Sequence, residues 1–218
     1  MSLELVVFDW DGTLMDSTAA ITRSIQAAAA DLGLNVPNHK QASWVIGLGL
    51  RDSLSHAVPD LPKARIAEFV ERYRFHYLHS EPALGVFEGV SEMLDSLRSI
   101  GVPMAVATGK SRQGLNRALE QTGWHDYFIA TRTADEGHPK PHPWMLLDLM
   151  QAINVSPMRT VMIGDTTHDL EMAAAARTRA VAVSYGAHRQ SDLETCRPEA
   201  LFADTPALAR WLIAQAQA

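Results

Sequence analysis

Residues 5–14 read LVVFDWDGTL. Four apolar, largely β-branched residues end abruptly in acidic and turn-forming residues, which is typical of a buried strand followed by a turn. Asp9 and Asp11 are two residues apart, so their side chains leave an extended backbone on the same side. Two carboxylates that close need a neutralising partner, such as a bound cation, which leaves one of them able to carry a proton.

Strand and helix patterns alternate through the second part of the chain. We expect strands at 104–107, 127–130, 160–163 and 180–183. Helical patterns separate or follow them at 89–100, 112–121, 144–153, 168–176 and 205–215. Because such alternation is typical of a parallel sheet with helices on both faces, we predict an α/β fold.

Residues 15–84 carry helical patterns and no convincing strand. The expected helices are 19–32, capped by Ser17 or Thr18, and then 39–46, 50–57 and 63–79. This stretch follows the first strand and is too long for a single crossover. We therefore predict a core from residues 1–14 and 85–218, and a smaller all-helical domain from residues 15–84.

Polar side chains collect where the predicted strands end. Thr108 ends the second strand, Lys140 lies in a proline-rich loop, and Asp165 follows a later strand, with Asp169 four residues on. In open α/β sheets, ligands bind outside the carboxyl ends of the strands. Carboxylates at that edge suit Mg²⁺, which prefers oxygen ligands, and a hydroxyl with a cation suits an anion. Each residue taken alone is equally well an ordinary turn, cap or surface residue.

Two turns add backbone donors to this set. Gly12 and Thr13 belong to the turn after the first strand, and successive N–H groups in such turns bind phosphate oxygens. Gly109 follows Thr108, so its N–H can grip the same anion as the threonine hydroxyl. We expect these four residues to line the phosphate end of the site.

The motifs resemble those of the haloacid dehalogenase-like superfamily, in its phosphatase branch. Four of them match in order, namely Phe8–Leu14, Thr108-Gly109, Lys140-Pro141 and Gly164–Asp169. The first motif is specific and four in order are very specific, and they span residues 8 to 169. The resemblance implies a Rossmann-like three-layer core with an α-helical cap inserted after the first motif.

The resemblance also implies the reaction, which is Mg²⁺-dependent phosphate-ester hydrolysis. Asp9 corresponds to the nucleophile, which forms a phospho-aspartyl intermediate. Asp11 corresponds to the general acid that protonates the leaving oxygen and later activates water, and its backbone carbonyl to a metal ligand. An aspartate at position 11 favours phosphoryl chemistry over dehalogenation, because dehalogenase members need no leaving-group acid there.

The remaining motif residues correspond to binding groups. Thr108 and Lys140 correspond to the phosphate-binding pair. Asp165 corresponds to a magnesium ligand, and Asp169 to a ligand or a partner of one. The implied metal set is Asp9, Asp11, Asp165 and Asp169.

In relatives with this type of cap, a loop between cap helices reaches the active site and helps to select the substrate. The matching stretch is residues 45–51, where Gly47 and Gly49 would let the backbone approach a ligand closely. Arg51 is the candidate cap cation for a second anionic or polar group. Phosphoglycolate phosphatases show a similar layout, which also serves sugar phosphates, nucleotides and pyrophosphate. The expected partner is a small phosphorylated metabolite, either phosphoglycolate-like or a sugar phosphate.

Composition and charge narrow the function classes. The 218 residues carry a formal net charge of −6 and no Lys/Arg-rich run, which argues against a nucleic-acid partner. The single cysteine, Cys196, excludes an internal disulfide and suits a reducing compartment. Without a targeting segment or an apolar run near the roughly 20 residues of a membrane span, we expect a cytoplasmic monomer or homodimer with no membrane partner.

Some residues near the motifs invite simpler interpretations. We interpret His142 and His168 as solvated loop residues. Trp10 lies between the two aspartates and faces the other way on the strand, so packing is its expected role.

Three other functions fit parts of the pattern. A phosphomutase of the same fold retains the phosphoryl group instead of passing it to water, and product analysis separates the two. A non-catalytic phosphate-binding module would usually lack one of the motif residues, which are all present here. A phospho-accepting signalling domain also clusters aspartates with Thr and Lys at strand ends, but it is shorter and has no helical insertion.

Overall fold

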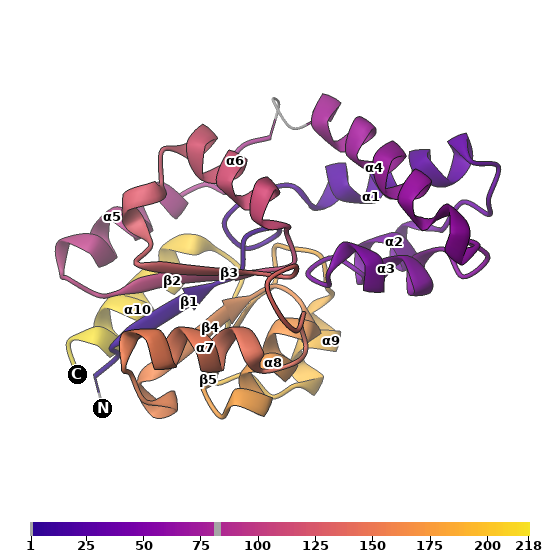
Figure 1. The fold of residues 1–218 in the computed structure, drawn as a ribbon. Coiled ribbons are helices and arrows are strands. Elements are labelled where there is room, and N and C mark those ends of the chain that lie inside the picture. Colours follow the sequence, from indigo (N-terminus) through magenta and orange to yellow (C-terminus); the bar gives the residue numbers. More distant parts are fainter. Residues whose placement is uncertain (1, 81–83) are drawn as a thin grey trace.

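The computed structural model describes residues 2–80 and 84–218, but not the side chains of residues 50–52. Its centre is a parallel six-stranded sheet in the order β3-β2-β1-β4-β5-β6 (Figure 1). The strands are β1 (Leu5–Phe8), β2 (Met104–Thr108), β3 (Ala130–Thr133), β4 (Thr160–Gly164), β5 (Arg179–Val183) and β6 (Ala200–Phe202). Strand addition changes direction at β1 and β4, so the ligand crevice of such a sheet lies at their carboxyl ends. The predicted α/β class is confirmed.

Helices cover both faces of the sheet, which explains the unbroken apolar run of β1. All four β1 residues are buried, as expected of a central parallel strand. Val6 and Phe8 pack with α5 (Val90–Ser99), α6 (Arg112–Thr122) and α10 (Thr205–Ala216). Leu5 and Val7 pack with α7 (Trp144–Ile153) and α8 (Thr167–Ala176) on the other face (Figure 1). The short α9 (Gln190–Thr195) contacts α8 and β5.

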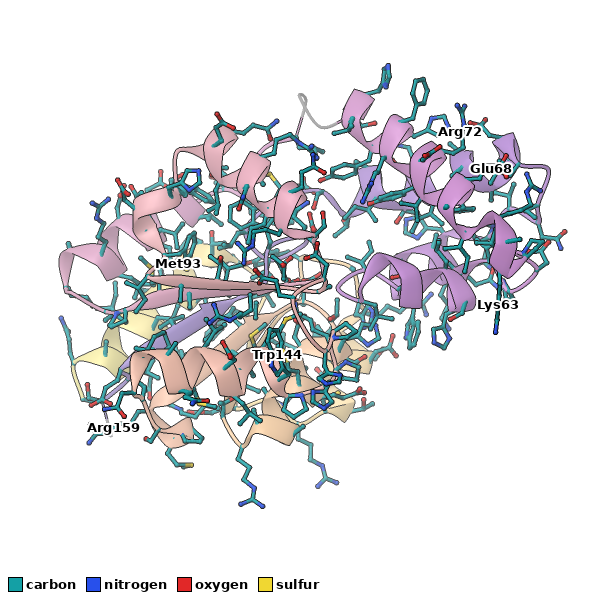
Figure 2. All side chains as sticks on the ribbon, in the orientation of Figure 1. Lys63, Glu68, Arg72, Met93, Trp144 and Arg159 are labelled. Carbon is teal, nitrogen blue, oxygen red and sulfur yellow. The ribbon has the colours of Figure 1, made fainter. Side chains whose placement is uncertain are left out.

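Four further helices lie beyond the carboxyl ends of the strands, away from both termini (Figure 1). They are α1 (Thr18–Asp31), α2 (His39–Trp44), α3 (Leu50–Ala57) and α4 (Ile66–Ser80), called here the cap helices. They share an apolar cluster that includes Ile25, Leu54 and Phe69. Figure 2 shows Lys63, Glu68 and Arg72 on the outer side of this group. The expected helical insertion is present over residues 18–80, and the domain boundaries at residues 15 and 84 stay a prediction.

No helix in the described ranges is both long and apolar enough to cross a lipid bilayer.

The strand predicted at 127–130 was wrong in position. Tyr127 ends a 3₁₀ turn, and the Phe128 ring packs 6.2 Å from that of Trp10, both measured between ring centroids. The sheet edge is instead formed by the more polar Ala130–Thr133. Phe128 and Trp10 fill the core beside the sheet edge. The apolar pattern of residues 127–130 therefore reflects side-chain packing and not strand pairing. Strand β6 and helix α9 were missed, because three and six residues carry too little periodicity.

Packing between α5 and the sheet gives a stability prediction. Figure 2 shows Met93 on this helix above the sheet, and its neighbour Leu94 is fully buried in the same cluster. We expect Leu94→Ala to lower the free energy of unfolding by about 2–5 kcal/mol, because it removes buried methyl groups and leaves a cavity. Urea unfolding followed by circular dichroism measures this.

The matched control is Leu147→Ala on α7, where the side chain is 47% exposed. It should change the free energy of unfolding by about 0.5 kcal/mol or less. Equal losses in the two variants would contradict the packing described.

Candidate active site

A buried lysine joins three separate elements at the end of β1. The Lys140 Nζ lies 2.6 Å from Asp9 Oδ1 and 2.6 Å from Asp169 Oδ1, with none of the three side chains more than 1% exposed. Burial alone lowers the pKa of Lys140, but Asp169 and Asp9 outweigh it and hold that pKa above its usual value. An ammonium is tolerated here only because carboxylates surround it.

Three carboxylates gather around this lysine. Asp9, Asp165 and Asp169 each place an oxygen within 4.8 Å of the others. Asp165 Oδ1 accepts a hydrogen bond from the Thr13 hydroxyl at 2.9 Å, and Oδ2 accepts one from the Ala187 N–H at 2.7 Å. Burial raises the pKa of Asp9 well above its usual value; Lys140 opposes the shift, and Asp169 and Asp165 add to it. Burial, reinforced by Asp169, raises the pKa of Asp165 to about 7.

The cluster fits a divalent cation. Asp9 Oδ2 is buried and has no hydrogen-bond partner among the described residues. Asp169 Oδ2 accepts from the Thr166 N–H and hydroxyl, while its Oδ1 receives no well-directed hydrogen bond but lies against the Lys140 ammonium. Three carboxylates against one ammonium leave excess negative charge without solvent, and hard oxygen donors of this kind suit Mg²⁺. Asp9, Asp165 and Asp169 are therefore the side chains that would hold the ion.

Asp11 lies outside this carboxylate cluster and has partners of its own. Its Oδ1 accepts from the Ser17 hydroxyl at 2.6 Å and lies 3.0 Å from Lys110 Nζ. Lys110 also donates to the hydroxyl of Tyr77 on α4 at 3.1 Å. Ser17 occupies the predicted N-cap position of α1, but its hydroxyl makes no capping bond and turns to Asp11 instead. Metal binding by the Asp11 carbonyl stays a prediction.

Lys110 is a site residue that sequence reasoning missed. The nearby signal was its position directly after Thr108-Gly109. Burial alone lowers the pKa of Lys110, but Asp11 and Tyr77 raise it above its usual value, so this side chain brings a second positive charge to the site. Lys140 and Lys110 thus neutralise different aspartates.

The turn after β1 touches the carboxylates directly. Gly12 has φ = +87°, and a Cβ at this position would lie 2.1 Å from Asp165 Oδ2, so only glycine fits. The Gly12 N–H donates to the Met15 carbonyl at 2.9 Å, and the Thr13 N–H to the Trp10 carbonyl at 3.4 Å. Both N–H groups thus donate within the turn, and phosphate binding by Gly12 and Thr13 stays a prediction. Trp10 itself is fully buried, as expected.

The cap loop, residues 45–49, rests on the loop after β2. A Cβ on Gly109 would lie 2.6 Å from the Gly47 carbonyl oxygen, so the two backbones meet only because Gly109 has no side chain. The Thr108 hydroxyl is buried and accepts from the Lys110 N–H at 3.2 Å. Gly109 therefore lies directly beside the cap loop. Phosphate binding by Thr108 and Gly109 stays a prediction.

The glycines of the cap loop lie beside the carboxylates, and their role in selecting the substrate stays a prediction. Gly47 and Gly49 line the same cavity as Asp9 and Asp11. Gly47 has φ = +90° and lies against Thr166. The Arg51 side chain is outside the described residues, so its substrate contact stays a prediction.

Two histidines of the core hold the end of α2. The interpretation of His168 as a solvated residue was wrong: it is 3% exposed, and its Nε2 lies 2.9 Å from the Trp44 carbonyl oxygen. His188 is also buried and places its Nε2 2.9 Å from the same oxygen. The Nδ1 of His188 accepts from the Thr167 N–H at 3.1 Å, so its Nε2 carries the hydrogen. Burial lowers the pKa of His168 to about 4, which keeps that ring neutral. No motif surrounds His188, so no signal marked it.

A family model described as haloacid dehalogenase-like hydrolase matches residues 6–183. The chain belongs to this family. Among curated proteins, it is 35% identical over 203 residues to the probable phosphatase IndB of Dickeya dadantii, covering 90% of this chain and 88% of that protein. It is 28% identical to the pyrophosphatase PpaX of Bacillus anthracis, with 91% of each chain covered. It is 31% identical to the phosphoglycolate phosphatase of Thiobacillus denitrificans, covering 87% of this chain and 86% of the relative.

The fold is shared with solved structures of this hydrolase family. A predicted phosphatase from Clostridium acetobutylicum superposes with a TM-score of 0.87 at 22% identity, covering 98% of this chain and all of that chain. At 22% identity, this similarity shows a shared fold and does not extend to activity. It confirms the Rossmann-like core implied by the motifs.

The raised pKa of Asp165 predicts how pH and magnesium affect stability together. The folded protein holds a proton on Asp165 up to about pH 7, whereas an ordinary aspartate releases it near 3.8. This contribution to stability is present at low pH and is lost as the pH rises toward 7. Metal binding needs ionised carboxylates. We expect MgCl₂ to raise the Tm more at about pH 8 than at about pH 5.5, as measured by scanning fluorimetry with an EDTA reference.

Asp165→Asn should reduce both the magnesium shift in Tm and its dependence on pH. The exposed Asp16 gives the control variant Asp16→Asn, which should keep both. A magnesium shift that is equal at the two pH values would contradict the assignment of Asp165.

The hydrogen bond from His188 to the Trp44 carbonyl predicts that loss of the His188 side chain raises KM. His188→Leu removes one of two donors to the Trp44 carbonyl, and a hydrogen bond contributes about 1 kcal/mol. We expect KM for p-nitrophenyl phosphate to rise about 3- to 10-fold with little change in kcat, because the cap loop is held less firmly. His188→Gln, which keeps a side-chain donor, should recover part of the loss. His142→Leu is the control, and an identical KM in both leucine variants would refute the role of His188.

Proposed function

We propose that the chain is a Mg²⁺-dependent phosphatase that hydrolyses a small phosphomonoester through a phospho-aspartyl intermediate on Asp9. The observation that carries this proposal is the state of Asp9: one oxygen is fixed by buried Lys140 and the other is unpartnered beside a cation-binding cluster. Family membership and relatives named as phosphatases support it.

In the first step Asp9 Oδ2 attacks phosphorus. A bond forms between that oxygen and phosphorus while the bond from phosphorus to the leaving oxygen breaks. Asp11, which takes up a proton from solvent when the substrate's phosphate draws Lys110 away from it, gives that proton to the leaving oxygen. Lys140 holds the attacking carboxylate in place and offsets the charge of the incoming phosphate dianion. A Mg²⁺ held by Asp9, Asp165 and Asp169 would supply further charge neutralisation at the phosphoryl group.

In the second step Asp11 takes a proton from water, whose oxygen attacks phosphorus. The bond between phosphorus and Asp9 breaks, which releases inorganic phosphate and restores the carboxylate. Ser17 and Lys110 fix the Asp11 carboxylate in one orientation for this exchange. The phosphate of a bound substrate competes with Asp11 for the Lys110 ammonium, since both are anions within reach of one cation.

The proposal assigns the other predicted residues to binding. Thr108 and Gly109, at the end of β2, would receive phosphate oxygens. Residues 15–84 would act as a cap domain whose loop selects the substrate, with Arg51 as a candidate contact. Phosphoglycolate and sugar phosphates are the first substrates to test.

Asp9→Asn should lower kcat for p-nitrophenyl phosphate at least about 10³-fold, because an amide is a poor nucleophile and no acyl phosphate can form. EDTA should abolish turnover by the unmodified protein, and MgCl₂ should restore it. Phosphate release measures both. Asp16→Asn is the matched control, since Asp16 is exposed and outside the site, and it should keep full activity.

Failure of folded, magnesium-loaded protein to hydrolyse the aryl phosphate, phosphoglycolate, sugar phosphates and nucleotides would refute the phosphatase proposal. Recovery of an isomeric phosphate ester in place of inorganic phosphate would identify a mutase.

A further inference from the structure

The cavity above the carboxylates has two chemically different walls. Its volume is about 850 Å³. Its core side is polar, and the charged residues there are Asp9, Asp11, Lys110, Arg117 and Asp135. The cap side is mostly apolar and consists largely of residues from α1, the cap loop and α4, among them Ile21, Ile25, Val45, Ile66, Val70 and Tyr73. Among the described cap residues that line it, the charged ones are Glu71 and Arg74, which have opposite signs.

This volume exists while the cap helices touch the core. His168 and His188 hold the Trp44 carbonyl, and Lys110 reaches the Tyr77 hydroxyl on α4. The Gly47 carbonyl oxygen lies so close to Gly109 that a Cβ there would come within 2.6 Å of it. The space therefore lies between two surfaces that are in contact, and it is partly open to solvent.

The size of the cavity and the apolar part of its lining favour a leaving group larger than a two-carbon acid. Pockets of roughly 300–1,000 Å³ enclose ligands much larger than a phosphoryl group with a two-carbon leaving group. A second carboxylate would lose its hydration against the isoleucine and valine side chains of the cap wall, which offer it no hydrogen bonds. An apolar group gains about 25 cal/mol for each Å² that it buries there.

We propose that the substrate's leaving group carries an apolar, ring-sized group that packs against the cap wall formed by α1, the cap loop and α4. The inference rests on the proposed phosphatase function and narrows its substrate class. The phosphoryl end binds at Asp9, Asp11 and Lys110, and the ring lies between Ile25 and Val70. Tyr73 and Tyr77, whose rings stack at 18° with centroids 5.9 Å apart, give this wall a flat aromatic part.

The test compares three primary alkyl phosphates: 2-phenylethyl phosphate, ethyl phosphate and phosphoglycolate. The first two have a similar leaving oxygen and differ mainly in the ring, so intrinsic reactivity contributes little to their ratio. We expect kcat/KM for 2-phenylethyl phosphate to exceed that for ethyl phosphate by about 10- to 100-fold, as burial of an aromatic side chain suggests. Phosphoglycolate should fall well below 2-phenylethyl phosphate.

Two variants test whether the preference for the ring-bearing ester depends on the cap wall. Val70→Asn places a polar amide in the cap wall and should lower the ratio of the two kcat/KM values to about 3 or less. The ratio is insensitive to the amount of folded enzyme, because both substrates meet the same sample. Val36→Asn, at a cap residue that is 53% exposed, should leave the ratio unchanged.

The outcomes separate this inference from the proposed function. Turnover with equal or higher kcat/KM for ethyl phosphate or phosphoglycolate would overturn the ring preference and leave the phosphatase proposal standing. A ring preference that persists in Val70→Asn would overturn its assignment to the cap wall. No turnover of any of the three esters or of the aryl phosphate would overturn the proposed function itself.

Discussion

Lys140, buried between Asp9 and Asp169, is the contact on which the site depends. It joins the end of β1, the loop that follows β3 and the start of α8, which are distant in sequence. Loss of Lys140 would leave buried carboxylates without a compensating charge or solvent, at a cost of about 3–5 kcal/mol. The same ion pair therefore constrains the strand order and the chemistry: the sheet must bring β1 and β4 together for the charges to balance.

The three carboxylates outnumber the Lys140 ammonium, and a bound cation would neutralise this excess negative charge. Burial raises the pKa values of Asp9 and Asp165. The neighbouring carboxylates add to both shifts, because Lys140 alone cannot neutralise three carboxylates. The hydrophobic layers on both faces of the sheet hold this arrangement in place, and Gly12 allows the turn to approach Asp165 without a side chain. A divalent cation held by these carboxylates would offset the excess negative charge and stabilise the fold, so affinity for the metal and instability without it would have one origin.

The sequence predicts those features of the fold and site that depend on neighbouring residues. The apolar run of β1 and the acidic residues after it place Asp9 and Asp11 correctly, because a buried parallel strand and its turn carry strong patterns. The spacing of the later motifs brings Asp165, Asp169 and Lys140 to the same sheet edge. The edge strand β3 was misplaced because three of its four residues are only partly buried and its sequence carries no strong apolar pattern. Lys110, Ser17 and His188 acquire their roles from partners in other elements, which periodicity does not encode.

The cap helices divide the site by chemistry. In the proposed reaction, core residues at the strand ends carry out the chemistry, and the cap wall surrounds the leaving group. Ile25 and Val70 belong to the apolar cluster that holds the cap helices together, and they also line the cavity. A substitution there changes the packing of the cap and the surface offered to the substrate at once. Under the proposed function, specificity is therefore coupled to cap stability, whereas Asp9 and Lys140 are held by partners within the core.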